Sequence, residues 1–303
     1  MGNEISIFDF LKKFPDEETC HEFIEKSRWP TGVNCPHCNS HRNYWLKNQT
    51  RYKCGSCRKQ FSIRTGTMLT ESKVPFQKWL MAVWILTSYR KGISSVQLAK
   101  TLGVTQKTAW FLAHRIRAAL KEGNGGMFNG QTEVDETYIG GKEKNRHKSK
   151  KLKAGRGPVG KAAVVGLKQR GGRVIAYAIT KTNAKTLHRV VHNNVETGSE
   201  VYTDDHRTYC GLLDYDHSVV RHSVGEYVNQ MASTNDIEYF WALLKRGFYG
   251  IYHKTSPVHL QRYVDEFTFR DNTKDIGALK ILSRVFFNGN GRRLTYIGLT
   301  NGA

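Results

Sequence analysis

The sequence has few acidic residues and no long apolar run, and each absence limits what the protein can be. Its 26 Asp and Glu stand against 47 Lys and Arg in 303 residues, so the formal net charge is +21. Such an excess of one charge repels itself in the folded state and favours a polyanionic partner, nucleic acid above all. Hydrophobic residues still make up 39% of the chain, which indicates packed globular domains rather than a basic tail.

Segments that would direct the chain to a membrane are also missing. No apolar run approaches the roughly 18 residues that a membrane-spanning helix needs, and residues 1–10 have no cationic flank, so no secretory signal is predicted. Of six cysteines, four are closely spaced, which fits a metal site in a reducing compartment better than a disulfide framework. We therefore expect a cytoplasmic, nucleoid-associated protein with no membrane partner.

The four clustered cysteines form two CxxC pairs, Cys35/Cys38 and Cys54/Cys57, with 15 residues between the pairs. Tetrahedral zinc binds four such ligands, and each tight turn brings two thiolates to one side. Three short strand-like segments flank the pairs, at 43–47, 51–54 and 60–63. The pattern predicts a zinc ribbon with one structural Zn²⁺, because protein ligands fill all four positions.

Helical periodicity is found in four segments of the first 125 residues, at 16–27, 75–89, 95–102 and 106–120. Between the last two, Gly103 supplies a turn and Thr105 an N-cap, which is the pattern of a helix-turn-helix. Its second helix would meet base edges at its start and phosphates further along. Four residues are therefore predicted to contact DNA: Gln106, Lys107, Thr108 and Arg115. An ordinary helical hairpin has the same pattern, and the positive charge favours the DNA-binding interpretation.

After residue 125 the pattern changes to strands, predicted at 132–139, 162–167, 174–179, 200–203 and 218–221. Helices are predicted at 184–195, 236–248 and 258–269. Three strands followed by alternating helix and strand predict an α/β fold with a sheet of mixed direction. We expect four parts: an N-terminal helix and zinc ribbon (1–70), a helix-turn-helix segment (71–125), the sheet domain (126–275) and a C-terminal tail (276–303).

Three acidic residues fall where a sheet could bring them together. Asp135 lies in the predicted strand 132–139, Asp204 follows the strand 200–203, and Glu238 is near the start of a helix. Carboxylates in such places can converge and hold two divalent cations about 4 Å apart. On spacing alone, however, an exposed face shared by Glu238 and Lys245 is the better explanation of that helix.

Spacing also leaves a choice at the other two positions, because Asp135 is followed by Glu136 and Asp204 by Asp205.

Three motifs indicate the function more specifically than the spacing of the acidic residues does. They are VDETYIGG (134–141), VYTD (201–204) and NDIE (235–238) with Trp241 after it. With these motifs the chain resembles, over nearly its whole length, the bacterial insertion-sequence transposases that have an N-terminal zinc ribbon and a ribonuclease-H-like DDE catalytic domain. The resemblance implies a ribonuclease-H-like fold and a catalytic site with two Mg²⁺ (or Mn²⁺) ions.

By this resemblance, Asp135 and Asp204 are the first two metal ligands, and Glu238 or Asn235 supplies the third. We prefer Glu238, because an ionised carboxylate binds magnesium better than an amide does. Relatives are expected to have His shortly before the Asn, whereas this chain has Ser233 and Thr234 there. Lys245 is expected to meet a phosphate bound at the site, as a point charge on a flexible stem.

Between Gly141 and Lys161, nine residues are Lys or Arg and only Glu143 opposes them. A solvated loop explains this charge, but a loop of this kind beside an acidic metal site is also suited to hold a phosphate backbone. Four of its residues are predicted to contact DNA: Lys150, Lys151, Lys153 and Arg156.

The expected function is to bind the terminal inverted repeats of an insertion sequence, hydrolyse a phosphodiester there and join the freed 3′-hydroxyl to target DNA. Two ends must be brought together, so a homo-oligomer on double-stranded DNA is expected. One alternative is a metal-dependent nuclease of the same fold that cuts without joining. Another is a catalytically inactive zinc-ribbon regulator, against which the presence of Asp135, Asp204 and Glu238 weighs.

Overall fold

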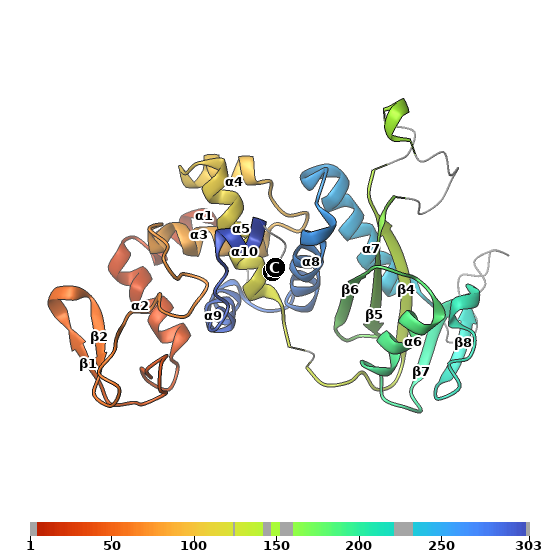
Figure 1. The fold of residues 1–303 in the computed structure, drawn as a ribbon, viewed down its shortest axis with the longest axis horizontal. Helices are drawn as coiled ribbons and strands as arrows, with labels where there is room; N and C mark the ends of the chain where they lie inside the picture. Colours follow the sequence, from red (N-terminus) through yellow and green to blue (C-terminus); the bar gives the residue numbers. More distant parts are fainter. Residues whose placement is uncertain (1–4, 124, 142–146, 152–159, 221–232, 301–303) are drawn as a thin grey trace. The chain divides into compact units, whose positions relative to one another are not determined.

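The structure is a computed structural model that describes residues 5–123, 125–141, 147–151, 160–220 and 233–300. The chain forms two compact units (Figure 1). The helical unit consists of Met1–Lys121 together with Thr273–Ala303, and the sheet unit consists of Glu122–Asn272. The Nδ2 of Asn272 donates a hydrogen bond to Oε2 of Glu122 over 3.3 Å, so the first and last residues of the sheet unit are neighbours.

The helical unit begins with two capped helices and a small antiparallel sheet. The helices are α1 (Ile7–Lys13) and α2 (Glu17–Arg28), and the strands are β1 (Asn43–Leu46), β2 (Arg51–Cys54) and β3 (Gln60–Phe61). Ser6 and Asp9 form a capping box on α1, and Asp16 caps α2. Arg28 at the end of α2 donates to the carbonyls of Ile63 and Thr65, which attaches this helix to the segment after β3.

The pair of helices that the sequence predicts on either side of Gly103, as a helix-turn-helix or as an ordinary helical hairpin, is present. It consists of α4 (Ser95–Leu102) and α5 (Gln106–Leu120), and α3 (Phe76–Ser88) precedes it. Gly103 ends α4 with a φ of +59°, a left-handed conformation that glycine adopts without strain. The side chain of Thr105 then accepts a hydrogen bond from the Thr108 amide, which caps α5.

Residues after 276 form helices that were not expected from the sequence. These are α9 (Ala278–Asn288) and α10 (Tyr296–Thr300). The buried residues of α9, Leu282, Val285 and Phe286, belong to the side by which it packs against α2, α3 and α5. The core of the helical unit is therefore built from both ends of the chain.

In the described part of the sheet unit, five strands pair in the order β6-β5-β4-β7-β8. They are β4 (Thr132–Ile139), β5 (Ala162–Gln169), β6 (Val174–Ile179), β7 (Glu200–Asp204) and β8 (Asp216–Val220). β4, β5 and β6 are antiparallel neighbours, whereas β7 runs parallel to both β4 and β8. This arrangement confirms the predicted α/β fold with a sheet of mixed direction. Arg221, which was predicted to end the last strand, lies outside the described residues.

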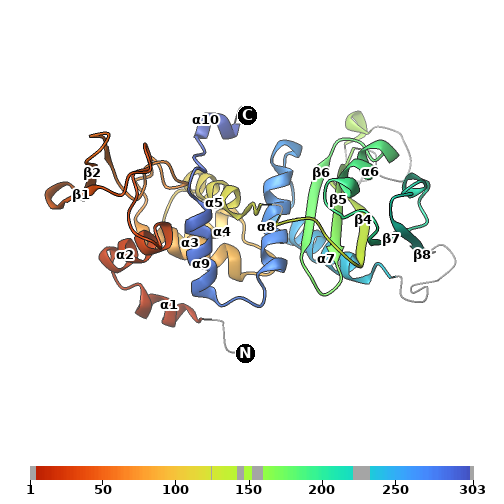
Figure 2. The ribbon, with the colours of Figure 1, turned by 90° about the horizontal axis from the view of Figure 1, so that it is seen from below.

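Helices cover both faces of this sheet (Figure 2). They are α6 (Ala184–His192), α7 (Asn235–Gly247) and α8 (Leu260–Asn272), and a π-helix, η6 (Phe248–Tyr252), follows α7 directly. Val164 packs with α7 and α8, whereas the next residue, Val165, packs with α6. The alternation of side chains along each strand therefore supplies two separate apolar cores. Short 3₁₀ helices complete the described structure: η1 (Lys47–Gln49), η3 (Lys148–Lys150), η4 (Arg207–Tyr209) and η7 (Pro257–His259).

Candidate active site and metal centre

The predicted acidic site lies where two parallel strands of the sheet unit run side by side. In the pairing of β4 with β7, Glu133 is opposite Tyr202. Continued by two residues, this register places Asp135 opposite Asp204, the last residue of β7. The charge of Asp204 acts on Asp135. The structure thus brings together the first two carboxylates that the sequence singled out.

Asp135 and its acidic neighbour Glu136 point to opposite faces of the sheet. Nε1 of Trp241, on α7, donates a hydrogen bond to Oδ2 of Asp135 over 2.9 Å. The hydroxyl of Tyr209, which belongs to the core on the α6 face, donates to Oε2 of Glu136 over 2.5 Å. Asp135 therefore shares a face with the helix that carries Glu238, a distinction that spacing alone did not give.

The environment of Asp135 disfavours its negative charge. Burial first, and then the charges of Glu136 and Asp204, raise the pKa of the Asp135 carboxyl to about 7. Hydrogen bonds from the Glu136 amide, at 2.8 Å, and from Trp241 favour the ionised form but do not outweigh burial. A divalent cation fits such a pair of carboxylates, because magnesium prefers charged oxygen ligands and would offset the repulsion between them.

Both candidates for the third ligand lie in the first turn of α7. Asn235 begins the helix, and both Asn235 and Glu238 are exposed. Oε1 of Glu238 accepts a hydrogen bond from the Thr234 hydroxyl over 3.3 Å. Among the described residues, the four cysteines are the one group of three or more His, Cys, Asp or Glu residues whose ligand atoms all lie within 4.8 Å of one another. The choice between Glu238 and Asn235 thus stays a prediction.

Glu133 has a positioning role that the sequence analysis missed. Its side chain is 1% exposed, and Oε2 accepts a hydrogen bond from the Ile237 amide in the first turn of α7 over 3.0 Å. Oε1 lies 3.5 Å from the Arg170 guanidinium. Glu133 therefore fixes the start of α7 against β4, two residues before Asp135. The available signal was its place in the strand, on the same face as Asp135.

A glycine on β5 lets α7 come close to Asp135. Gly166 is the β5 partner of Asp135 in the antiparallel register. A Cβ atom at Gly166 would lie 2.7 Å from the Trp241 ring and 2.9 Å from Cδ1 of Ile237. Only glycine fits without a shift of the helix, so the sequence of β5 sets the distance between α7 and the carboxylates.

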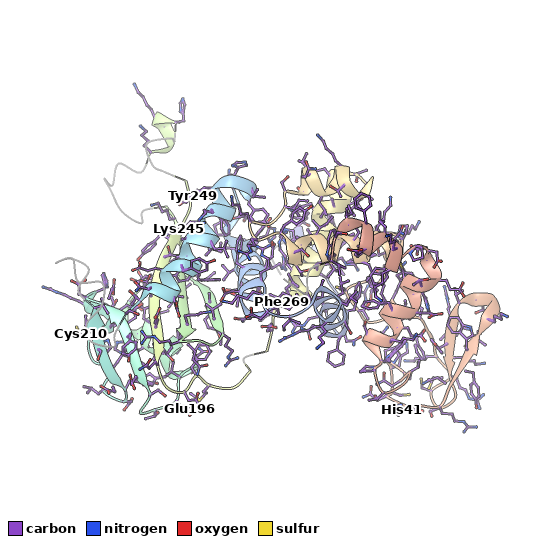
Figure 3. All side chains as sticks on the ribbon, turned by 180° about the vertical axis from the view of Figure 1, so that it is seen from behind. His41, Glu196, Cys210, Lys245, Tyr249 and Phe269 are labelled. Carbon is purple, nitrogen blue, oxygen red and sulfur yellow. The ribbon has the colours of Figure 1, made fainter. Side chains whose placement is uncertain are left out.

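Lys245 lies near the other end of α7 and is half-buried. It comes seven residues after Glu238, so the two side chains lie on one stripe of the helix. Figure 3 labels Lys245 and, one turn further on, Tyr249 of η6.

The raised pKa of Asp135 gives a testable effect on stability. Because the folded pKa of about 7 exceeds the ordinary 3.8, the metal-free protein loses stability as the pH rises from 4 to 7, and the loss persists above 7. Asp135→Asn removes this loss but also weakens one hydrogen bond. We expect it to increase the free energy of unfolding by about 1–3 kcal/mol at pH 8.

Chemical unfolding in the presence of a chelator measures this difference. At pH 4 no gain is expected, and Asp205→Asn, which alters an exposed acid, serves as the control. An equal effect of Asp135→Asn at both pH values would contradict the assigned environment.

The four cysteines of the ribbon are gathered as a tetrahedral metal site requires. Sγ of Cys35 lies 3.7 Å from Sγ of Cys57, and Sγ of Cys38 lies 3.6 Å from Sγ of Cys54. Four sulfurs at 2.3 Å from a zinc ion would be about 3.8 Å apart. Amides within the turns point at the sulfurs, and that of Cys57, with that of Ser56, lowers the pKa of the Cys54 thiol to about 6. The donor set thus fits a structural Zn²⁺.

We expect one zinc ion per chain in the purified protein, and a Cys54→Ser variant to lose most of it, because a hydroxyl is a poor replacement for a thiolate. Metal analysis of both proteins by mass spectrometry gives the stoichiometry. A Cys20→Ser variant is the matched control, since Cys20 is buried outside the cluster. Full zinc retention by Cys54→Ser would contradict the assignment.

The four residues of α5 that were predicted to contact DNA differ in their exposure to solvent. Gln106 and Lys107 are exposed at the start of α5, and Thr108 is half-buried beside its cap. Arg115 is only 5% exposed: its guanidinium donates to the Thr70 carbonyl and lies over the ring of Phe111. In this structure Arg115 therefore does not present its charge to a phosphate, because the packing of α5 turns it inward.

The basic segment after β4 is described only in part. Lys151 is exposed, and only the backbone of Lys150 is described. Lys153 and Arg156 lie outside the described residues. Their predicted contacts with DNA stay predictions.

Comparison with known families agrees with this architecture. The family model of the ISXO2-like transposase domain matches residues 127–272, which contain the acidic site. The family model of the transposase zinc-ribbon domain matches residues 15–60, which contain the four cysteines. Both matched models describe domains of transposases. The chain belongs to the insertion-sequence transposases that combine these two domains.

No curated protein matches the chain. In the described part of the structure, no helix has the length and apolar character needed to span a bilayer.

Proposed function

We propose that the protein cuts double-stranded DNA at the terminal inverted repeats of its insertion sequence and joins the freed 3′-hydroxyl to target DNA. One observation carries this proposal: in the transposase domain, Asp135 is half-buried beside Asp204, under the helix that bears Glu238. Neighbouring carboxylates are suited to bind divalent cations, and Mg²⁺ or Mn²⁺ is the proposed cofactor.

Two such ions, when bound, would activate the attacking oxygen and stabilise the leaving oxygen of the phosphodiester. The protein's own residues would position these ions and the DNA strand. Asp135 and Asp204 supply oxygen ligands from adjacent strands, and Glu238 supplies the third from α7. Trp241 orients the Asp135 carboxylate through its hydrogen bond. Lys245 meets the phosphate on the same stripe of α7 and so holds the DNA strand along the helix.

DNA binding is proposed for the helical unit and for the basic segment. Gln106 and Lys107 are exposed at the start of α5, where a recognition helix contacts base edges. Lys151 and its basic neighbours would hold the phosphate backbone near the carboxylates. Two DNA ends must meet for joining, so the active form is proposed to be a homo-oligomer.

A strand-transfer assay with a pre-cut terminal duplex tests the proposal. We expect joined product in Mg²⁺ with the wild-type protein and none with Asp204→Asn, because the variant lacks a metal-ligand charge. Cleavage of uncut ends without any joining would favour a nuclease of the same fold. Terminal DNA binding without cleavage or joining would favour an inactive regulator.

A further inference from the structure

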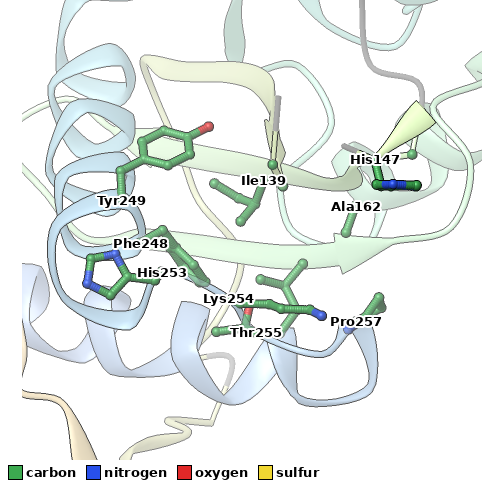
Figure 4. A pocket seen from close by; sticks show the side chains of 13 residues that line it. Ile139, His147, Ala162, Phe248, Tyr249, His253, Lys254, Thr255 and Pro257 are labelled. Carbon is green, nitrogen blue, oxygen red and sulfur yellow. The ribbon is translucent and has the colours of Figure 1, made fainter. Parts of the chain in front are cut away.

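A cavity of about 620 Å³ lies at the end of β4, outside the carboxylate site. Ile139, the last residue of β4, lines it together with Phe248, Tyr249, His253 and Lys254 (Figure 4). Ile139 comes four residues after Asp135, which is about 13 Å along a strand. At roughly 3.4 Å per nucleotide of a duplex strand, the cavity is within four nucleotides of the carboxylates, and fewer if the DNA strand is unstacked.

The turn that forms one side of the cavity has an uncommon backbone. α7 continues into the π-helix η6, which ends at His253 with a φ of +54°. The His253 amide closes the turn on the Phe248 carbonyl over 2.7 Å. A π-turn and a non-glycine residue at positive φ both cost free energy, and both occur frequently at functional sites. Here they carry the rings of Phe248, Tyr249 and His253 to the same cavity.

The chemistry of the lining suits one kind of ligand. Tyr249 is 50% exposed and offers an aromatic face, while Phe248 beneath it is buried. Lys254 adds a cation at the cavity. Aromatic faces with a neighbouring cation bind unpaired nucleotides, because a base in a duplex has both faces covered by its neighbours. Glu238, Lys245 and Tyr249 follow one another along one stripe of the helix, so a DNA strand at the carboxylates would lead to this cavity.

We propose that the cavity binds an unpaired nucleotide of the DNA strand that lies in the carboxylate site. The base stacks on Tyr249, and Lys254 neutralises a phosphate beside it. This inference rests on the proposed function, since it requires DNA at the carboxylates. The nucleotide comes from either the terminal repeat or the target DNA, because the two offer the same chemistry.

Fluorescence of 2-aminopurine tests the proposal with the full-length protein, in Ca²⁺ so that the DNA is bound without being cut. The probe replaces, one position at a time, the unpaired nucleotides at the end of a terminal duplex, and in a second series those of a target duplex. We expect quenching by the wild-type protein at one position, in one of the two series, because stacking on tyrosine quenches the probe. The responding series identifies the source of the nucleotide.

Tyr249→Ala should abolish this quenching and weaken binding of the unpaired DNA about tenfold, whereas Tyr249→Phe should retain both. Tyr239→Ala is the matched control, because Tyr239 is 56% exposed on α7 but does not line the cavity. A wild-type protein that cleaves terminal DNA but quenches no position overturns this proposal alone, and equal quenching by Tyr249→Ala does the same. A protein that neither binds nor cleaves terminal DNA overturns the proposed function as well.

Discussion

Glu238→Gln is expected to abolish end cleavage and strand transfer while DNA binding is retained. The substitution keeps the shape of the side chain and its place in the first turn of α7, but it removes the charge that a metal ligand needs. Loss of a residue that only supports a metal ligand lowers metal affinity or activity about 10–100-fold. Loss of a ligand itself should therefore lower the cleavage rate by more than this. Asn235→Ala should reduce the rate by less than about tenfold, since an amide contributes less to magnesium binding.

Magnesium-dependent cleavage of a terminal-repeat duplex compares these variants directly. Lys245→Ala belongs in the same series. It should raise the DNA concentration needed for half-maximal cleavage by a larger factor than it raises the magnesium concentration needed for half-maximal cleavage. The opposite ranking, with normal cleavage by Glu238→Gln and an inactive Asn235→Ala, would assign the third position to the asparagine.

Gly166→Ala is expected to destabilise the sheet unit and to reduce cleavage at least tenfold, although Gly166 has no side chain to contribute. The added Cβ would lie 2.7 Å from the Trp241 ring, and a buried indole is too rigid to move by rotation of its own bonds alone. α7 must therefore move away from β5, which lengthens the hydrogen bond from Trp241 to Asp135 and displaces Glu238. Such overpacking typically costs 1–3 kcal/mol.

Thermal unfolding and cleavage rates at saturating magnesium measure the two effects. Gly123→Ala is the matched control, because a Cβ there meets no atom within 4 Å. If Gly166→Ala unfolds and cleaves as the wild-type protein does, the close packing of α7 on β5 is not what positions the site.

Local signals in the sequence were sufficient for most of the elements. α4 and α5 have the predicted bounds because apolar periodicity, the Gly103 turn and the Thr105 cap all lie within a few residues of one another. β4 likewise starts and ends as predicted, since a run of strand-forming residues is bounded by glycines. The zinc ribbon was predictable because its four cysteines form two CxxC motifs that are visible in the sequence.

Contacts between distant segments were not predictable in the same way. The pairing of β4 with β7 brings Asp135 to Asp204, and only three-dimensional packing separates Asp135 from Glu136. The inward turn of Arg115 depends on the carbonyl of Thr70, which no pattern within α5 indicates. Glu133 was missed because its partner, the Ile237 amide, is 104 residues away.

The insertion of the sheet unit into the helical unit has a consequence for synthesis. The ribosome makes the chain from its N-terminus, and domains begin to fold as they emerge. The sheet unit is complete at Asn272, whereas the helical unit still lacks α9, which packs against α2, α3 and α5. The proposed DNA-binding unit thus finishes folding last, after the unit that carries the proposed catalytic site. A product of premature termination before α9 would carry the carboxylates of the proposed catalytic site but would lack a finished helical unit.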